Sequence, residues 1–462
     1  MLSNVKNPRQ GEISLNAMKM YGILPVLLQN AACNYGGRKS ASSHYGELFH
    51  RFLSEYTERK SWSYARLNEF RNQRLAAMIK HCYETVPFYT ALFNEYGFDC
   101  RSIKTLEDLR VLPVLNKQIV RDNYDRFIST AIPKERVTQV STGGTTGSSF
   151  IIQTTEDTNI EKNAMWWSYR QNIGIPYGTW GGYFGYNHFV PAKQTKPPFW
   201  RICSPQKAVY FSSFHVSEAN LKHYIAEINR RRLRWLHGFP SLLSLLAGYM
   251  AERGLRFDCP LTHVTTGSEH LHDYQKNIME QAFGVTPHQH YGMTEDVANI
   301  SENKDHVMYV DEDYSAVEFV PYNGGHMIVG TSLTNFAMPL LRWETNDCAQ
   351  VETQPDGSRR VISLDGRSED IITLPDGRKI GRLDHVFREA VHFKEVQIYQ
   401  HKDYSITIYA VKTQDDVTAD EKIGLSKLRQ SIGNAVKAEF KYVDEIPRTS
   451  RNKLRFVVSE IK

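Results

Sequence analysis

The sequence predicts an α/β protein: a large N-terminal domain of mostly parallel sheets flanked by helices plus a β-rich subdomain, and a small C-terminal α+β domain. Short apolar runs alternate with longer runs of helical periodicity between about residues 135 and 291, as in parallel strands joined by helices. Short strand patterns follow beyond residue 300. The last ninety or so residues combine strand and helix patterns within the usual size of a domain, and the length of 462 residues favours two domains.

The first half of the chain contains most of the expected helices. Residues 1–60 have weak periodicity and many polar breaks, so we expect an irregular N-terminal arm packed on the main body. Apolar residues from Leu67 to Cys82 then recur at helical spacing and Pro87 follows, which predicts a helix. Further helices are expected at 159–171, 218–231, 241–252 and 273–283, and strands at 182–186, 235–237, 263–265 and just before Tyr291. Ligands of such sheets bind at the carboxyl ends of the strands.

The second half contains most of the remaining strands. These are expected at 307–309, 316–321, 327–329 and 340–343, with a turn at Asn323 and Gly324. In the tail we expect strands at 396–400 and 405–411 and a helix from 419 to about 436.

Composition excludes several classes of protein. Hydrophobic residues make up 41% of the chain and charged residues 23%, as in ordinary globular proteins. A net charge of +5 spread along the chain does not favour nucleic acid as a partner. The six cysteines have no paired spacing, and no stretch resembles a signal peptide or a membrane span. We therefore expect a cytoplasmic enzyme with reduced thiols, either a monomer or a homodimer.

A loop rich in glycine and hydroxyl groups is the strongest local feature. Residues 141–149 read STGGTTGSS and follow an expected strand. Glycines let the backbone approach a polyphosphate, and hydroxyls and backbone N–H groups can donate to its oxygens. The loop lacks the Gly-Lys-Ser/Thr ending of a Walker A motif. Taken alone, it is equally consistent with a flexible turn.

Three further segments stand in a fixed order behind that loop. They are residues 291–295 (YGMTE), 366–370 (GRSED) and 447–453 (PRTSRNK). Together the four segments resemble the motifs of the adenylate-forming superfamily of acyl-CoA synthetases, and within it the phenylacetate–CoA ligase group and CapK-like relatives from capsule polysaccharide clusters. The resemblance covers nearly the whole chain from about Trp62. It implies a large adenylation domain at 61–366, a hinge at 367–370 and a small mobile domain at 371–462.

The resemblance also implies a role for each motif residue. The loop would hold the ATP phosphates, Thr294 would face the α-phosphate, and Glu295 would bind Mg²⁺. Asp347 would accept the ribose hydroxyls, and Lys453 would neutralise charge at the reacting groups. The remaining nucleotide residues are Ser141, Thr142, Gly143, Gly144, Thr145, Thr146, Gly147, Gly267, Ser268, Glu269, Tyr291, Gly292, Met293 and Arg367, and the hinge residues are Glu369 and Asp370. The chain departs from the family pattern at Ser148, Asn346, Glu369 and Asn452.

The pocket for the acid is the least specified part of the site. The family counterpart of the strand at 182–186 borders the carboxylate substrate, so the resemblance suggests an aromatic-lined pocket. Its expected substrate-binding residues are Tyr183, Phe184, Tyr186 and His188. A buried strand would explain the same aromatic residues equally well. The lone histidines His188, His237 and His290 are expected to have structural rather than catalytic roles.

The resemblance implies an ATP-dependent, AMP-forming ligase that activates a carboxylic acid as its acyl adenylate. ATP and Mg²⁺ would be required, with coenzyme A as the default acyl acceptor. The alternative acceptor is an amine or hydroxyl of an amino acid or sugar nucleotide in capsule or O-antigen polysaccharide biosynthesis. A catalytically silent nucleotide-binding homologue is a further alternative. The sequence names neither the acid nor the acceptor.

Overall fold

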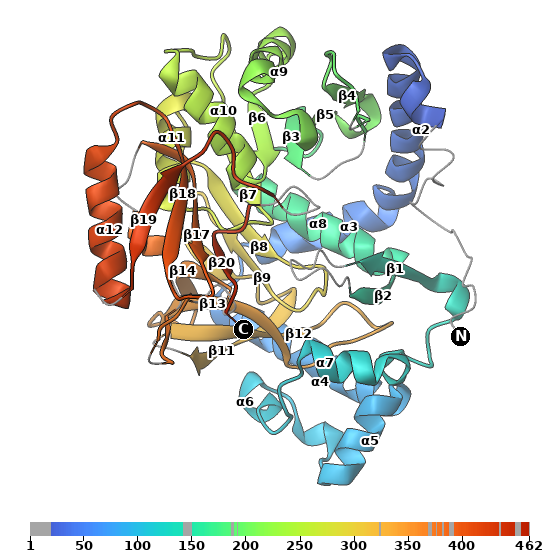
Figure 1. The fold of residues 1–462 in the computed structure, drawn as a ribbon. Helices are drawn as coiled ribbons and strands as arrows, with labels where there is room; N and C mark the ends of the chain where they lie inside the picture. Colours follow the sequence, from blue (N-terminus) through green and yellow to red (C-terminus); the bar gives the residue numbers. More distant parts are fainter. Residues whose placement is uncertain are drawn as a thin grey trace.

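The fold was analysed in a computed structural model. It describes residues 20–141, 150–185, 189–191, 193–322, 325–367, 372–375, 377–380, 383–387, 392–433, 436–448 and 454–461. The expected α/β fold is confirmed: helices flank one large sheet, and a second, smaller sheet lies beside it (Figure 1). None of the helices in these ranges is long and apolar enough to cross a membrane.

Twelve strands form the large sheet. Its parallel part contains β3 (Gly181–Gly185), β5 (Ala208–Ser212), β6 (Trp235–Gly238), β7 (His263–Gly267) and β8 (His288–Gly292). Strand β4 (Trp200–Cys203) closes one edge antiparallel to β5. Beyond β8 the sheet continues antiparallel through β9 (Asn299–Glu302), β10 (Met308–Val310), β14 (Arg359–Arg367), β13 (Trp343–Thr353), β12 (Gly325–Ser332) and β11 (Ser315–Tyr322). The β-rich part of the chain therefore extends the parallel sheet.

Helices cover both faces of the parallel strands. On one face, α9 (Glu218–Arg231), α10 (Pro240–Glu252) and α11 (Asp273–Phe283) pack on a core that includes Phe184 and Leu236. On the other face, α3 (Glu47–Arg59) and α8 (Glu156–Asn172) pack against Tyr183 and Trp235. Consecutive residues of one strand thus serve opposite layers, as the alternation of side chains along a strand requires.

The N-terminal segment is helical where it is described, so the expectation of irregular backbone is wrong. Helix α2 (Val26–His44) lies against the edge strand β4. Asn30 Oδ1 accepts the Ile202 N–H at 3.0 Å, and Gln29 Oε1 accepts from Nε of the buried Arg201 at 2.7 Å. Amide side chains therefore satisfy polar groups of the sheet edge. The buried residues of this helix are Gln29, Cys33 and Gly37, so its buried face lacks the apolar periodicity of an ordinary surface helix.

Helices α4 (Tyr64–Thr85) and α5 (Pro87–Tyr96) pack against the antiparallel part of the sheet. The hairpin of β1 (Val137–Ser141) and β2 (Ile151–Thr155) is separate from the large sheet. The strand expected at 340–343 is wrong, because β13 begins only at Trp343. Arg342 has a φ of +50°, which lies outside the extended region of a regular strand.

The C-terminal part forms its own four-stranded sheet. Strands β17 (Phe393–Gln400), β18 (Ile406–Lys412), β19 (Ala438–Tyr442) and β20 (Val457–Ser459) surround a separate apolar core with α12 (Thr418–Ile432). Helix α12 ends before the expected residue 436, because Gly433 leaves the helical conformation with a φ of +77°. The small sheet contacts the large body along α10, where Lys394 Nζ lies 2.8 Å from Glu252 Oε1.

Candidate active site

The carboxyl ends of three neighbouring parallel strands assemble the candidate site. Strand β6 ends at Gly238, β7 at Gly267 and β8 at Gly292, and the three strands are adjacent in the sheet. Parallel strands place their carboxyl ends at the same edge, so the loops at 239–241, 268–269 and 293–295 lie at this edge. Gly238 is required sterically, because a Cβ atom there would lie 2.3 Å from the Phe184 carbonyl oxygen.

Tyr291 and Asp347 connect two of the sequence motifs directly. The Tyr291 hydroxyl donates to Asp347 Oδ2 at 2.8 Å, although three strands separate β8 from β13 in the sheet. The antiparallel part of the sheet must therefore curl back over the end of β8, and register shifts after Met327 and Cys348 accompany this curvature. Burial, followed by the adjacent Asp347 carboxylate, raises the pKa of the Tyr291 phenol well above its usual value. The phenol therefore remains a hydrogen-bond donor.

Arg367 and Phe150 both contact β13, the strand that carries Asp347. Arg367, the last residue of β14, is paired directly opposite Asp347 in the β13–β14 ladder. Phe150, which follows the glycine-rich segment, stacks on Trp343 at the start of β13 with ring centroids 5.7 Å apart. Ser141 is the last residue of β1 and is paired with Ile151. The end of β14 and the residue that precedes β2 are therefore both held against β13.

A buried ion pair anchors the segment that carries Thr294 and Glu295. Asp296 follows them with a left-handed φ of +55°. Lys162 Nζ, from α8, lies 2.8 Å from Asp296 Oδ1, and the Tyr314 hydroxyl donates to the same oxygen at 3.1 Å. Although Asp296 has these partners, burial raises the pKa of its carboxyl group. The ion pair fixes the backbone immediately after the half-buried Glu295.

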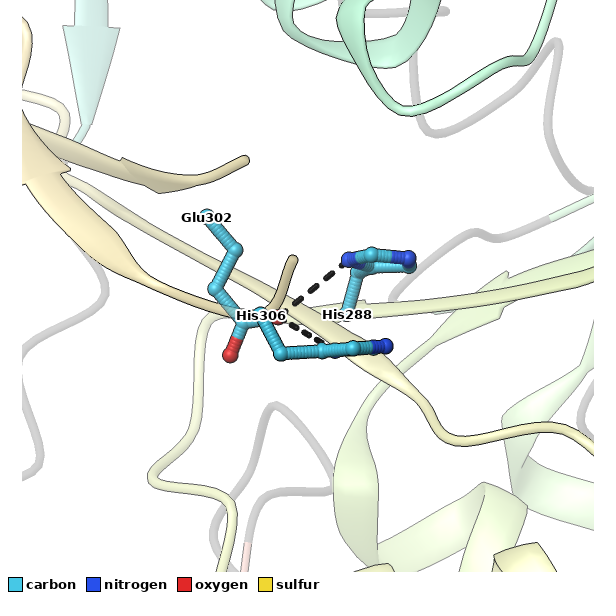
Figure 2. Close-up of side chains that lie close together, drawn as sticks. All are labelled: His288, Glu302 and His306. Carbon is cyan, nitrogen blue, oxygen red and sulfur yellow. Dashed lines mark hydrogen bonds and ion pairs between the residues drawn. The ribbon is translucent and has the colours of Figure 1, made fainter. Parts of the chain in front are cut away.

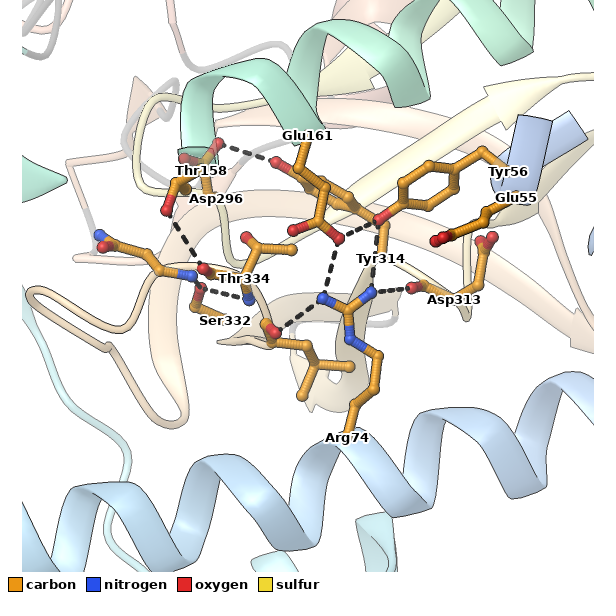
Figure 3. Close-up of polar contacts among 12 residues, drawn as sticks. Glu55, Tyr56, Arg74, Thr158, Glu161, Asp296, Asp313, Tyr314, Ser332 and Thr334 are labelled. Carbon is orange, nitrogen blue, oxygen red and sulfur yellow. Dashed lines mark hydrogen bonds and ion pairs between the residues drawn. The ribbon is translucent and has the colours of Figure 1, made fainter. Parts of the chain in front are cut away.

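The Asp296 anchor belongs to a larger polar network between the N-terminal helices and the sheet (Figure 3). Glu161, next to Lys162 on α8, accepts from the Tyr56 hydroxyl at 2.7 Å and from Arg74 Nη2 at 2.9 Å. Arg74 also donates to the Leu333 carbonyl at 3.0 Å. Sequence reasoning missed this network, because its members are scattered among helices and loops without a spacing that marks them.

The C-terminal segment reaches the same edge of the large sheet. Glu269, which follows β7, accepts the Ser241 N–H on Oε2 at 3.1 Å and the Leu454 N–H on Oε1 at 3.3 Å. Arg448 Nη1 donates to Ser241 Oγ at 2.7 Å and forms an ion pair with Glu395 on β17. The segment that immediately follows Lys453 is therefore hydrogen-bonded to a residue of the expected nucleotide site.

Glu395 is a site residue that the sequence analysis missed. Burial raises the pKa of its carboxyl group to about 7, although Arg448 opposes the shift. Strand β17 also contains Lys394, Gln397 and Gln400, so its glutamate did not stand out in the sequence. The burial of this acidic side chain marks it, since such a group is almost never fully buried without a partner.

The expected acid-binding aromatics separate onto two faces of β3. The Tyr183 ring lies 5.8 Å from the His237 ring and 5.3 Å from the Trp235 ring, on the α8 side. Phe184 is fully buried on the other face and stacks on Phe211. We therefore leave Phe184 out of the proposed site and retain Tyr183.

The two described histidines expected to be structural, His237 and His290, are neutral. Burial lowers the pKa of His237 to about 3 and that of His290 to about 4. His237 Nδ1 is hydrogen-bonded to Thr265 Oγ1 at 2.9 Å, and the His290 ring lies 5.2 Å from that of Tyr169. These contacts agree with the structural roles expected for both.

Several predicted site residues lie outside the described residues, and their roles stay predictions. They are Thr142, Gly143, Gly144, Thr145, Thr146, Gly147, Tyr186, His188, Glu369, Asp370 and Lys453. The side chain of Arg367 also lies outside the description.

Comparisons with solved structures define the class of fold. A 2-hydroxyisobutyryl-CoA ligase in the postadenylation state aligns with a TM-score of 0.68 at 17% identity, over 87% of this chain and 92% of the other. In the thioesterification state the TM-score falls to 0.56 over 87% of this chain. The fold is thus that of adenylate-forming ligases.

Comparisons with known sequences specify the relationship. Protein CapK of Staphylococcus aureus is 24% identical over 459 residues, which cover 96% of this chain and 99% of that protein. The phenylacetate-coenzyme A ligase of Escherichia coli is 26% identical over 338 residues, 67% of this chain and 72% of that protein. Residues 372–460 match the CapK C-terminal domain family. The chain is therefore a homologue of CapK and of the phenylacetate-coenzyme A ligases.

Proposed function

We propose that this chain is an ATP-dependent, AMP-forming ligase that activates a carboxylic acid and passes the acyl group to coenzyme A. The hydrogen bond between Tyr291 and Asp347 carries the proposal, because it joins two motif segments at the carboxyl edge of the sheet. Tyr291 presents a flat ring to a base, and Asp347 presents carboxylate oxygens to ribose hydroxyls. The pair therefore suits a nucleoside.

The proposed reaction has two steps. A carboxylate oxygen of the acid attacks the α-phosphorus of ATP, the bond to the β-phosphate breaks, and pyrophosphate leaves. The acceptor then attacks the acyl carbon and AMP leaves. Lys453 would stabilise the charge that develops in the first step. The contact of Leu454 with Glu269 supports this role, because it brings the adjoining backbone to the site.

The half-buried carboxylate of Glu295 fits Mg²⁺, since oxygen ligands suit this hard cation. Mg²⁺, when bound, supplies positive charge beside the ATP phosphates. Replacing Glu295 with glutamine is expected to weaken Mg²⁺-dependent ATP binding about tenfold, because the ligand loses its charge. Calorimetry of ATP at several Mg²⁺ concentrations measures this effect. Identical Mg²⁺ dependence in variant and wild type contradicts the role.

Replacing Tyr291 with phenylalanine is expected to raise the Kd of ATP about tenfold, or ~1.4 kcal/mol, because it removes the hydrogen bond that orients Asp347. Equilibrium binding of ATP measures the change. Tyr309→Phe is the matched control, since Tyr309 is also a half-buried strand tyrosine. Equal Kd values for Tyr291→Phe and wild type contradict the proposed nucleoside site.

A second acceptor class is favoured by one observation. The match to CapK spans 96% of the chain, whereas the match to the Escherichia coli ligase spans 67%, and the small domain matches the CapK family. An amine or hydroxyl, of the kind carried by amino acids and sugar nucleotides in capsule or O-antigen polysaccharide biosynthesis, is therefore the alternative to coenzyme A. Measuring AMP release across a panel of acids with and without coenzyme A distinguishes the two. AMP release that increases with coenzyme A, together with loss of its free thiol, supports coenzyme A as the acceptor. AMP release that depends only on an added amine or alcohol supports the alternative acceptor.

A further inference from the structure

Three potential metal-ligating side chains meet away from the proposed nucleotide site. His288 is the first residue of β8, Glu302 is the last residue of β9, and His306 lies in the turn before β10. Glu302 Oε2 lies 3.3 Å from His288 Nδ1 and 3.1 Å from His306 Nδ1. Figure 2 shows both rings in contact with the same carboxylate.

The spacing of these atoms suits a tetrahedral metal ion. The three ligand atoms all lie within 4.8 Å of one another. Bonds of about 2.0–2.1 Å in a tetrahedral zinc site separate neighbouring ligand atoms by about 3.3 Å, close to both measured distances. His288 Nδ1 is buried and its neighbour is Glu302 Oε2, at a distance longer than that of a good hydrogen bond. A metal ion between the two atoms would bind both.

The two rings are held together at the carboxylate. The imidazoles are stacked with centroids 4.0 Å apart, and each presents Nδ1 to Glu302. A metal ion would bind the ionised carboxylate and the neutral form of each imidazole.

A neighbouring residue holds the carboxylate in position. Gln289 Nε2 donates to Glu302 Oε1 at 3.1 Å, which leaves Oε2 directed to the histidines. Such outer hydrogen bonds orient metal ligands. The His306 side chain is 31% exposed, so water can reach a fourth ligand position.

We propose that His288, Glu302 and His306 bind a divalent transition metal ion, for which zinc is the best fit, with water as the fourth ligand. Two imidazole nitrogens and one carboxylate oxygen are typical zinc ligands. The ion would fasten the β9–β10 turn to the start of β8. His288 lies three residues, about 10 Å, before Tyr291 and on the opposite face of the strand. The site is therefore separate from the proposed nucleotide site, and the proposal does not depend on the proposed reaction.

The test is zinc binding by the full chain, freed of any affinity tag and treated with a chelator. Competition with a chromophoric chelator is expected to show one tight Zn²⁺ site per chain. His306→Asn is expected to weaken that site at least about tenfold, by analogy with the loss of groups that support metal ligands. Asparagine tolerates the left-handed φ of +59° at this position. His50→Gln, which removes an exposed histidine elsewhere, is the control and keeps wild-type affinity.

Two results overturn the proposal: wild-type protein that binds no zinc tightly, or His306→Asn that binds zinc as tightly as wild type. Cobalt provides a second readout, since a four-coordinate Co²⁺ site gives intense visible absorption. That absorption is expected in wild type and lost in the isosteric variant Glu302→Gln. If His306→Asn does not fold, the Glu302→Gln comparison decides, and unchanged absorption in it contradicts the site.

Discussion

Replacing Lys453 with alanine is expected to lower the rate of adenylation by about 10²–10³-fold, the range seen when one preorganised charge-stabilising group is lost. ATP binding is expected to change little, because Tyr291 and Asp347 are unaltered. The physical reason is that an ammonium group placed between the carboxylate and the α-phosphate stabilises the transition state more than the bound substrates. Acid-dependent exchange of radiolabelled pyrophosphate into ATP measures the first step alone.

The control for Lys453→Ala is Lys402→Ala, which removes an exposed lysine from the same small domain. It is expected to retain the wild-type exchange rate. If Lys453→Ala also retains that rate, Lys453 has no role in adenylation. A parallel loss of ATP binding in Lys453→Ala would instead show that the lysine acts on ground-state binding.

Replacing Lys162 with methionine is expected to destabilise the large domain by about 3–5 kcal/mol, because it leaves Asp296 buried without its cationic partner. The midpoint of urea unfolding, followed by tryptophan fluorescence, measures this loss. Adenylation is expected to fall as well, because Asp296 immediately follows Thr294 and Glu295. An unfolding midpoint within error of wild type contradicts the anchoring role of the ion pair.

A second substitution separates charge burial from lost packing. Asp296→Asn removes the charge and tolerates the left-handed backbone, so Lys162→Met/Asp296→Asn is expected to be more stable than Lys162→Met alone. The folded-state pKa of Asp296 lies above its unfolded value. Its stabilising contribution is therefore present at low pH and is lost as pH rises through the folded pKa. Lys162→Met is accordingly expected to lose more stability at about pH 8 than at about pH 5.

Local sequence signals predicted the helices of the parallel region well. Helix α9 spans the expected residues 218–231; it starts after Ser217 and ends where Arg232 adopts a left-handed φ of +53°. Helix α11 ends at Phe283, before Gly284 with a φ of +71°. Both helices combine an apolar face with local end signals, so their bounds did not depend on tertiary contacts.

Features set by distant contacts could not be predicted in the same way. Helix α2 contacts a sheet edge through the amides of Gln29 and Asn30, and its buried residues give no apolar periodicity. Phe184 and Tyr183 are adjacent aromatic residues with the same sequence signal, but they lie on opposite faces of β3. The candidate zinc ligands are separated by thirteen residues and then three, which matches no familiar motif. Only the antiparallel pairing of β8 with β9 brings them together.

The curl of the sheet that joins Tyr291 to Asp347 is a further example. The motif resemblance suggested that both residues serve the nucleotide, whereas the sheet order alone would place them far apart. Their 2.8 Å hydrogen bond shows that antiparallel β13 contributes Asp347 to the site at the carboxyl ends of the parallel strands. The roles of residues outside the described ranges, including Lys453, are inferred from the motif resemblance.

The most direct test of the central claim is exchange of radiolabelled pyrophosphate into ATP, measured with wild type and Lys453→Ala across aryl, fatty, amino and uronic acids. We predict exchange that requires one class of acid and Mg²⁺ and that is lost in the variant. Absence of acid-dependent exchange with every class, although ATP binds, would contradict adenylation and favour a catalytically silent nucleotide-binding homologue.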